Sequence, residues 1–193
     1  HMPHIPHPHM PHIPRPHGYF PHLIDQYIHS KWAHYIFQCA LATVSLIIIL
    51  IMGNTLLRAA IVVGVASSAF TVFVVPNSVA ATPRKVIGGH FVAGLVGAGV
   101  SLVVQLPGVE TYVSETRYLL DIAAALSVGI GIVLMVVTNT EHPPAAGTSL
   151  GLVIQCCHLG AGIDWSSISF ILVSAVLLSG VRIALRDRMV NLL

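Results

Sequence analysis

The residues best suited to chemistry stand at two short polar interruptions of an otherwise apolar chain. Residues 141–144 read Glu-His-Pro-Pro and separate two apolar runs. The other interruption begins near Asn77, and Arg84 and His90 follow it. Bilayer hydrocarbon tolerates non-helical backbone only where protein or water satisfies the freed N–H and C=O groups. Ionisable groups at such places commonly mark a substrate or ion site.

The two interruptions share one pattern, which predicts a pair of helical hairpins of the same sense and an internal repeat. Each has an apolar run, an asparagine in a polar turn, proline at a helix start and then small residues. Asn77 and Asn139 hold equivalent places, about 62 residues apart. Proline is well placed in a first helical turn, where its missing N–H costs nothing.

Two helix N-termini that meet in a bundle would present backbone N–H groups and positive dipole ends, which favours an anion. Arg84 is the favoured ligand, because a guanidinium matches a planar oxyanion bidentately. His90 lies about one helical turn inside its segment, and we expect it to meet Glu141, Asn139 or a ligand. Glu141 would repel an anion unless it pairs with Arg84 or Lys85, or is protonated for proton coupling.

The same residues also have an architectural interpretation. The prolines would only shape tight turns, and Arg84 and Lys85 would be ordinary basic residues of a cytoplasmic loop. Gly88 and Gly89 would let helices approach closely, and His142 would lock the Pro-Pro turn with a hydrogen bond.

The elements that must position these residues are predicted to be transmembrane helices. The chain is 55% hydrophobic and only 8% charged, with a mean hydropathy of +0.83. Six uncharged stretches approach the ~20 residues that a ~30 Å hydrocarbon core requires. They are Trp32–Leu57, Ala59–Pro83, Val86–Val109, Ile122–Thr140, His142–Ile163 and Trp165–Val181. We predict an all-α, polytopic bundle with about six segments, of which the fifth is the weakest and could be re-entrant.

Basic residues predict the orientation. If all six segments cross, one side receives Arg15, Lys31, Arg84, Lys85, Arg186 and Arg188. Lys/Arg bias then makes that side cytoplasmic and places both termini there. No transit peptide is visible, which favours a prokaryotic plasma membrane over a plastid envelope.

Residues 1–30 form a tail rich in histidine and proline, and residues 31–193 form the transmembrane domain. Proline fixes φ and removes backbone donors, so the tail is predicted to be extended or disordered. Imidazoles on such a tail can bind divalent metals loosely, which leaves a metal-handling membrane protein as one alternative function.

The chain resembles the HPP family of integral membrane proteins. The resemblance rests on His142-Pro143-Pro144 with its flanks and on the upstream Pro-x-Ser, Pro-Arg and Gly-Gly-His elements. Plant plastid and cyanobacterial members of this family are described as nitrite transporters, so the resemblance implies a site for a small monovalent anion. The candidate substrate-binding residues are Arg84, His90, His142, Asn77, Asn139, Thr148 and Glu141. The candidate structural residues of the motif are Pro83, Gly88, Gly89, Pro143, Pro144 and Gly147.

The leading hypothesis is therefore a transporter or channel for a nitrite-like anion, with the lipid bilayer as its other partner. A non-transporting scaffold or cofactor-holding membrane protein is a further alternative. No nucleophile–base spacing or phosphate-binding glycine loop indicates an enzyme, and we predict no cofactor, metal site or nucleic-acid partner. The glycine-rich helices would also suit contacts between protomers of a homo-oligomer.

Overall fold

The computed structural model describes residues 28–53, 59–159 and 163–192, and all regular structure in these ranges is helical. The α-helices are α1 (Ile28–Gly53), α2 (Ala59–Val74), α3 (Pro83–Val104), α4 (Val109–Glu115), α5 (Arg117–Val137), α6 (Ala146–Leu159) and α7 (Trp165–Ala184). Short 3-10 helices are η2 (Val79–Ala81), η3 (Pro143–Ala145) and η4 (Arg186–Arg188). The predicted all-α class is confirmed. The predicted disordered tail lies almost wholly outside the described residues.

Four described helices are long and apolar enough to cross a membrane. The spans are Trp32–Ile49, Pro83–Val104, Tyr118–Val137 and Trp165–Ala184. α2 and α6 have 16 and 14 residues, or roughly 24 and 21 Å at about 1.5 Å per residue. They are shorter than the predicted segments Ala59–Pro83 and His142–Ile163, because residues 75–83 lie outside α2 and residues 142–145 lie outside α6. The structure thus supports four spans by length and composition.

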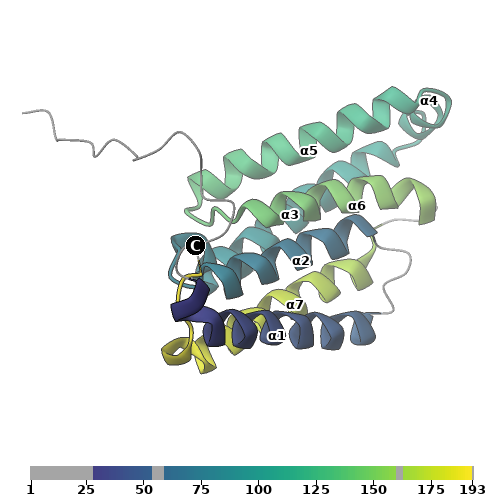
Figure 1. The fold of residues 1–193 in the computed structure, drawn as a ribbon. Helices are drawn as coiled ribbons and strands as arrows, with labels where there is room; N and C mark the ends of the chain where they lie inside the picture. Colours follow the sequence, from purple (N-terminus) through teal and green to yellow (C-terminus); the bar gives the residue numbers. More distant parts are fainter. Residues whose placement is uncertain (1–27, 54–58, 160–162, 193) are drawn as a thin grey trace, which may run out of the picture.

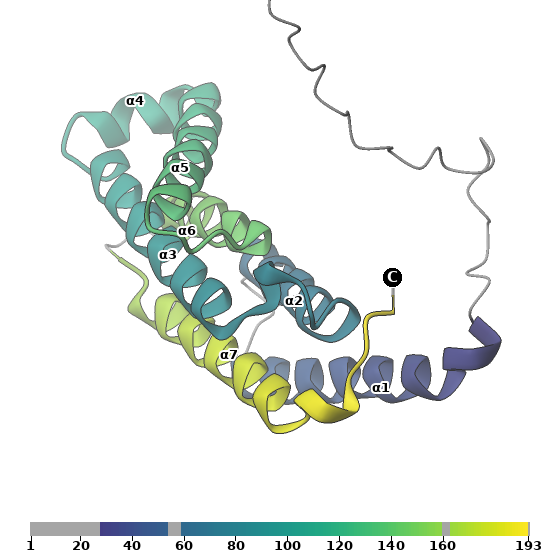
Figure 2. The same cartoon turned by 90° about the vertical axis from the view of Figure 1, so that its left-hand side faces the viewer.

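The long helices lie side by side, with α3 near the middle (Figure 1). α3 packs against α5, α6 and α7, while α2 packs against α1, α6 and α7. The view in Figure 2 shows α5 and α1 toward opposite sides of this arrangement. α4 lies at the N-terminal end of α5, away from the α2–α3 and α5–α6 connections (Figure 1).

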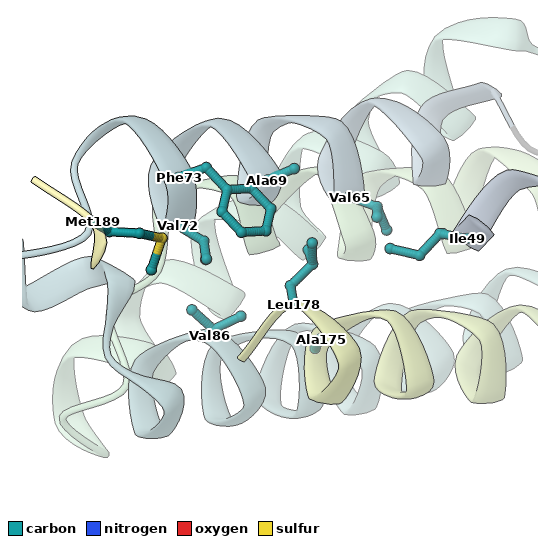
Figure 3. Close-up of a cluster of buried hydrophobic side chains, with 9 residues drawn as sticks. All are labelled: Ile49, Val65, Ala69, Val72, Phe73, Val86, Ala175, Leu178 and Met189. Atoms are coloured by element: carbon teal, nitrogen blue, oxygen red, sulfur yellow. The ribbon is translucent and has the colours of Figure 1, made fainter. Parts of the chain in front are cut away.

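The largest cluster of buried apolar side chains lies where α1, α2, α3 and α7 meet. In Figure 3, Leu178 of α7 points toward the Val65–Phe73 face of α2, with Ile49 at one end of the cluster and Met189 at the other. By contrast, α5 exposes many large apolar side chains along its length, among them Leu126 and Val133. Such an exposed apolar surface is what a helix presents to lipid.

Candidate functional site

Two non-helical segments meet at one end of the bundle. We call residues 75–82, between α2 and α3, the first break, and residues 138–145, between α5 and α6, the second break; η2 and η3 lie within them. His142 Nδ1 of the second break donates a hydrogen bond to the Ala80 carbonyl of the first, at 2.9 Å. The breaks therefore lie on the same side of the bundle.

The second break ends α5 with a backbone motif of its own. The Asn139 N–H donates to the Val136 carbonyl and the Thr140 N–H to the Met135 carbonyl. These are the two hydrogen bonds of a Schellman motif, which needs a left-handed residue after the helix. Asn139 supplies it with a φ of 54°, a conformation that asparagine tolerates better than most residues. The turn is thus fixed by neighbouring backbone.

The first break is held from further away. The Leu192 N–H donates to the Val74 carbonyl, and Gln38 Nε2 donates to the Phe73 carbonyl. Arg182 Nε lies 3.0 Å from the Pro76 carbonyl, which also accepts from Nη2. α1, α7 and the C-terminal segment together satisfy carbonyls that the end of α2 leaves without helical partners.

Glycines allow the second break to lie directly on α3. A Cβ added at Gly89 would stand 2.7 Å from His142 Cβ and 2.9 Å from the Thr140 carbonyl oxygen. One added at Gly88 would stand 2.6 Å from Thr140 Cγ2. A Cβ added at Gly64 of α2 would stand 3.2 Å from the Pro144 carbonyl oxygen. The close approach of the second break to α3 is therefore enough to explain why glycines stand at positions 88 and 89.

Four buried polar side chains form a connected network behind the second break. Ser68 Oγ of α2 lies 2.8 Å from His90 Nε2 and 2.9 Å from His142 Nε2. His90 Nδ1 lies 2.8 Å from Thr148 Oγ1 of α6. The two imidazole centroids are 5.3 Å apart in an edge-to-face arrangement. Each of the four residues is at most 1% exposed, so the network is sealed between α2, α3, α6 and the second break.

The neutral network fixes the direction of its hydrogen bonds. A carbonyl only accepts, so His142 carries its proton on Nδ1 and offers the Nε2 lone pair to the Ser68 hydroxyl. Ser68 then has no second proton to give, and His90 Nε2–H donates to it. His90 Nδ1 in turn accepts from the Thr148 hydroxyl. The two histidines are opposite tautomers in this arrangement.

A second polar group lies nearer the end of the bundle. Lys85 of α3 forms an ion pair with Glu141, and its Nζ also donates to Asn139 Oδ1 at 2.7 Å. The Lys85 side chain is 11% exposed, whereas that of Glu141 is 41% exposed. The sequence predicts that Glu141 repels an anion unless it is paired or protonated, and the ion pair with Lys85 is one of the predicted pairings.

The predicted site residues do not all converge. Arg84, the favoured ligand, is exposed in the first turn of α3, and its neighbour Lys85 is the cation that reaches the second break. Asn77 is also exposed, and its N–H donates to Asn191 Oδ1 of the C-terminal segment. Of the three partners expected for His90, Glu141 and Asn139 contact Lys85 instead, and His90 bonds Ser68 and Thr148. The third alternative, a ligand, stays a prediction.

Ser68 is the network residue that the sequence did not single out. It joins the two histidines, yet a lone serine in an apolar helix resembles many packing residues. The available signal was the Gly64-x-x-x-Ser68 spacing, which places two small residues on one face of a membrane helix. Gly64 does face the second break, as Ser68 does.

The surroundings of the network disfavour the charged form of His142. Burial lowers the pKa of His142, which lies in the second break outside the four spans, to about 4, although its hydrogen bond to Ala80 raises it. Among the described residues, no three His, Cys, Asp or Glu side chains gather closely enough to hold a metal ion. Within the same ranges, Ser78 Oγ of the first break and Ser179 Oγ of α7 are buried without a hydrogen-bond partner.

Comparison with known proteins gives a family. The family model described as "HPP, transmembrane region" matches residues 28–189. A transmembrane protein of Dictyostelium discoideum is 36% identical over 125 residues, which cover 65% of this chain and 38% of the relative. Another transmembrane protein of the same organism is 31% identical over 108 residues, covering 56% and 30%. The chain thus spans about a third of the length of these curated relatives, and no solved structure matches it.

Proposed function

Because this chain belongs to the HPP family of integral membrane proteins, we propose that it carries a small monovalent anion across the bilayer, with nitrite as the first candidate substrate. One observation carries the proposal: the two breaks contact each other beside a buried lysine, two buried histidines and two buried hydroxyls. Polar groups within a membrane domain are expensive, and they commonly mark a pathway for ions or substrates.

The sign of the local charge supports an anion. Lys85 and Arg84 stand at the start of α3, and Glu141 neutralises only one of them. The α3 N-terminus adds the positive end of a helix dipole at the same place. The buried Ser78 hydroxyl of the first break is a further donor at this end of the bundle. The polar group of Lys85, Glu141 and Asn139 would attract the anion, and the buried network of the two histidines would receive it.

The proposal includes six crossings. α2 and α6 run beside helices of full length, and the breaks that adjoin them face the same end of the bundle. With six crossings, the basic residues of α3 and η4 fall on the side that the Lys/Arg bias makes cytoplasmic, together with both termini. Cysteine labelling from either side of a sealed vesicle, at exposed Asn77 and at exposed Tyr112, tests this topology.

An architectural function is the second candidate, and a specific observation favours it. Ser68, His90, His142 and Thr148 each already have a hydrogen-bond partner in the protein. A fully satisfied buried network can rigidify a bundle without contacting any substrate. The decisive measurement must therefore separate loss of transport from loss of folding.

The test is nitrite flux into proteoliposomes, with nitrate, formate and chloride as competitors. The key variant is Lys85→Met with Glu141→Met, which removes the cation without leaving its carboxylate partner unpaired. We expect flux to fall about tenfold or more, because a charge-assisted hydrogen bond to the anion is lost. Arg186→Met, at an exposed position in η4, is the matched control and should keep parental flux.

Two results would contradict the proposal, and they differ in meaning. Parental flux in the folded double variant would show that the Lys85–Glu141 pair does not serve the anion, and would move the site elsewhere. No saturable flux of any of the four anions through folded parent protein would end the transport hypothesis. The architectural function would then be the better account of the network.

A further inference from the structure

Ser68 occupies an unusual position, because three hydrogen-bonding atoms lie within reach of a hydroxyl that has only one proton to donate. His142 Nε2 lies at 2.9 Å, His90 Nε2 at 2.8 Å and the Gly64 carbonyl at 3.0 Å. A hydroxyl has one proton to donate and two lone pairs to accept with. The arrangement therefore has two complete hydrogen-bonding patterns, which differ by one proton.

In the first pattern both histidines are neutral. The Ser68 hydroxyl donates to His142 Nε2 and accepts from His90 Nε2–H, as derived above. In the second pattern His142 is an imidazolium that donates from Nδ1 to the Ala80 carbonyl and from Nε2 to Ser68. The Ser68 hydroxyl then turns to the Gly64 carbonyl, which is already at hydrogen-bond distance. No buried polar atom of Ser68 or His142 loses its partner when the proton arrives.

We propose that Ser68, His90 and His142 form a relay that takes up one proton and passes it between the two imidazoles, and that this proton accompanies the transported anion. The second half of the statement rests on the proposed function, whereas the first half rests on the hydrogen-bond geometry alone.

The transfer balances atom by atom. A protonated His90 gives its Nε2 proton to Ser68 Oγ while the Ser68 hydroxyl proton passes to His142 Nε2. His90 is left neutral with its proton on Nδ1, the serine is again a hydroxyl, and His142 carries protons on both nitrogens. The Thr148 hydroxyl, at 2.8 Å from His90 Nδ1, changes from donor to acceptor earlier, when His90 takes up its proton on Nδ1, and it stays the acceptor during the transfer.

Few other charges face the pair. α2, η2 and η3 carry no titratable residue, and α3 contributes Arg84, which is exposed, and Lys85, which is paired with Glu141 of the second break. The other titratable residues on helices that pack against α2, α3 or α6 lie toward helix ends or on the short α4, apart from Cys39 near the middle of α1. They are Cys156, Cys157 and His158 on α6, Arg182 on α7, Arg117, Tyr118 and Asp121 on α5, Glu110, Tyr112 and Glu115 on α4, and His29, Lys31, His34 and Tyr35 on α1. An anion that enters beside the pair would thus be the main new charge, and it would favour the protonated form.

The first experiment follows the ring nitrogens of ¹⁵N-histidine-labelled full-length protein by NMR. Signals of the pair are assigned from His90→Gln and His142→Gln protein. Near neutral pH we expect the proton on Nδ1 of His142 and on Nε2 of His90. On acidification the pair should take up one proton while the protein stays folded, and at a higher pH with nitrite than without it. If both rings stay neutral until the protein unfolds, the relay is wrong.

The second experiment measures nitrite uptake and internal acidification together in proteoliposomes that contain a pH-sensitive dye. Parent protein should acidify the lumen in proportion to nitrite uptake. Ser68→Ala should lose the acidification that accompanies uptake, whereas Ser67→Ala, at an exposed position on the same helix, should behave as the parent does. An unchanged ratio of protons to nitrite in folded Ser68→Ala protein would overturn the relay.

The two experiments distinguish failure of the proposed function from failure of the relay. Absence of nitrite flux in the parent defeats the proposed function and the coupling, while the NMR titration still decides whether the pair shares a proton. If Ser68→Ala protein does not fold, the titration of the parent decides the relay by itself.

Discussion

The two breaks begin from similar sequence patterns and each contains a short 3-10 helix, but they are held in place by different means. The second break closes α5 with backbone hydrogen bonds among Met135, Val136 and the residues that follow them. The first break also has local backbone hydrogen bonds, such as Ser78 N–H to the Val75 carbonyl. In addition, residues distant in sequence support it: Arg182 reaches its Pro76 carbonyl, and Gln38 and Leu192 reach the last two carbonyls of α2 beside it. A locally fixed turn leaves its side chains free to make long-range contacts, and the second break supplies His142, Glu141 and Asn139 to the polar groups. The first break mainly accepts hydrogen bonds through its carbonyls.

This comparison also separates the roles of the motif residues. His142 joins the breaks through the Ala80 carbonyl, so the second break contributes the side chain of this contact and the first contributes the backbone carbonyl. Gly88 and Gly89 belong to neither break, yet they set how closely the second break approaches α3. The following predictions change one of these features at a time.

The largest effect is expected where the second break lies on α3. In Gly89→Ala protein the new Cβ would stand 2.7 Å from His142 Cβ and 2.9 Å from the Thr140 carbonyl oxygen, so the break must move. We expect the free energy of unfolding to fall by about 3 kcal/mol relative to Gly94→Ala. Gly94 is on the same helix with nothing within 4 Å of its added Cβ, so both variants gain the same helix propensity. Equal stabilities, measured by denaturant titration in detergent, would show that the contact is not restrictive.

A smaller loss is expected when the first break loses its distant support. Arg182→Met removes both guanidinium hydrogen bonds to the Pro76 carbonyl, and we expect a loss of about 2 kcal/mol in the same titration. Arg186→Met, exposed in η4, controls for the change in charge and should alter stability by less than about 0.5 kcal/mol. If the two variants are equally stable, the first break is held by its own turn and the contrast between the breaks is lost.

The smallest effect tests whether the second break is encoded locally. Asn139→Gly keeps a residue suited to φ 54° but removes the Lys85 partner, whereas Asn139→Val removes that partner and adds strain. We expect the valine protein to be about 1 kcal/mol less stable than the glycine protein, because side chains other than glycine and asparagine disfavour this conformation. Thermal unfolding of the two variants side by side measures the difference. Identical midpoints would mean that backbone strain at Asn139 does not determine the turn.

The amino-acid sequence by itself determined the membrane class, the all-α fold and the places of the two breaks. Uninterrupted apolar runs specify helices in a bilayer, because only helical backbone satisfies itself there. Pro83 at the first position of α3 and Asn139 at the left-handed position after α5 are local signals, and both elements are present. The two family-like elements of the sequence named His90, His142 and Thr148, which the structure joins through Ser68 into one network.

Only the tertiary structure decided which side chains meet. Successive residues on a helix point about 100° apart, so Lys85 enters the bundle while Arg84, its neighbour in sequence, remains exposed. An amphipathic helix would have revealed that rotation, but a helix that is apolar all around carries no such signal in its sequence. For the same reason Ser68 could not be told from a packing serine until α2 was placed between His90 and His142. The support of the first break by Gln38, Arg182 and Leu192 likewise depends on how α1, α7 and the C-terminal segment assemble around the end of α2.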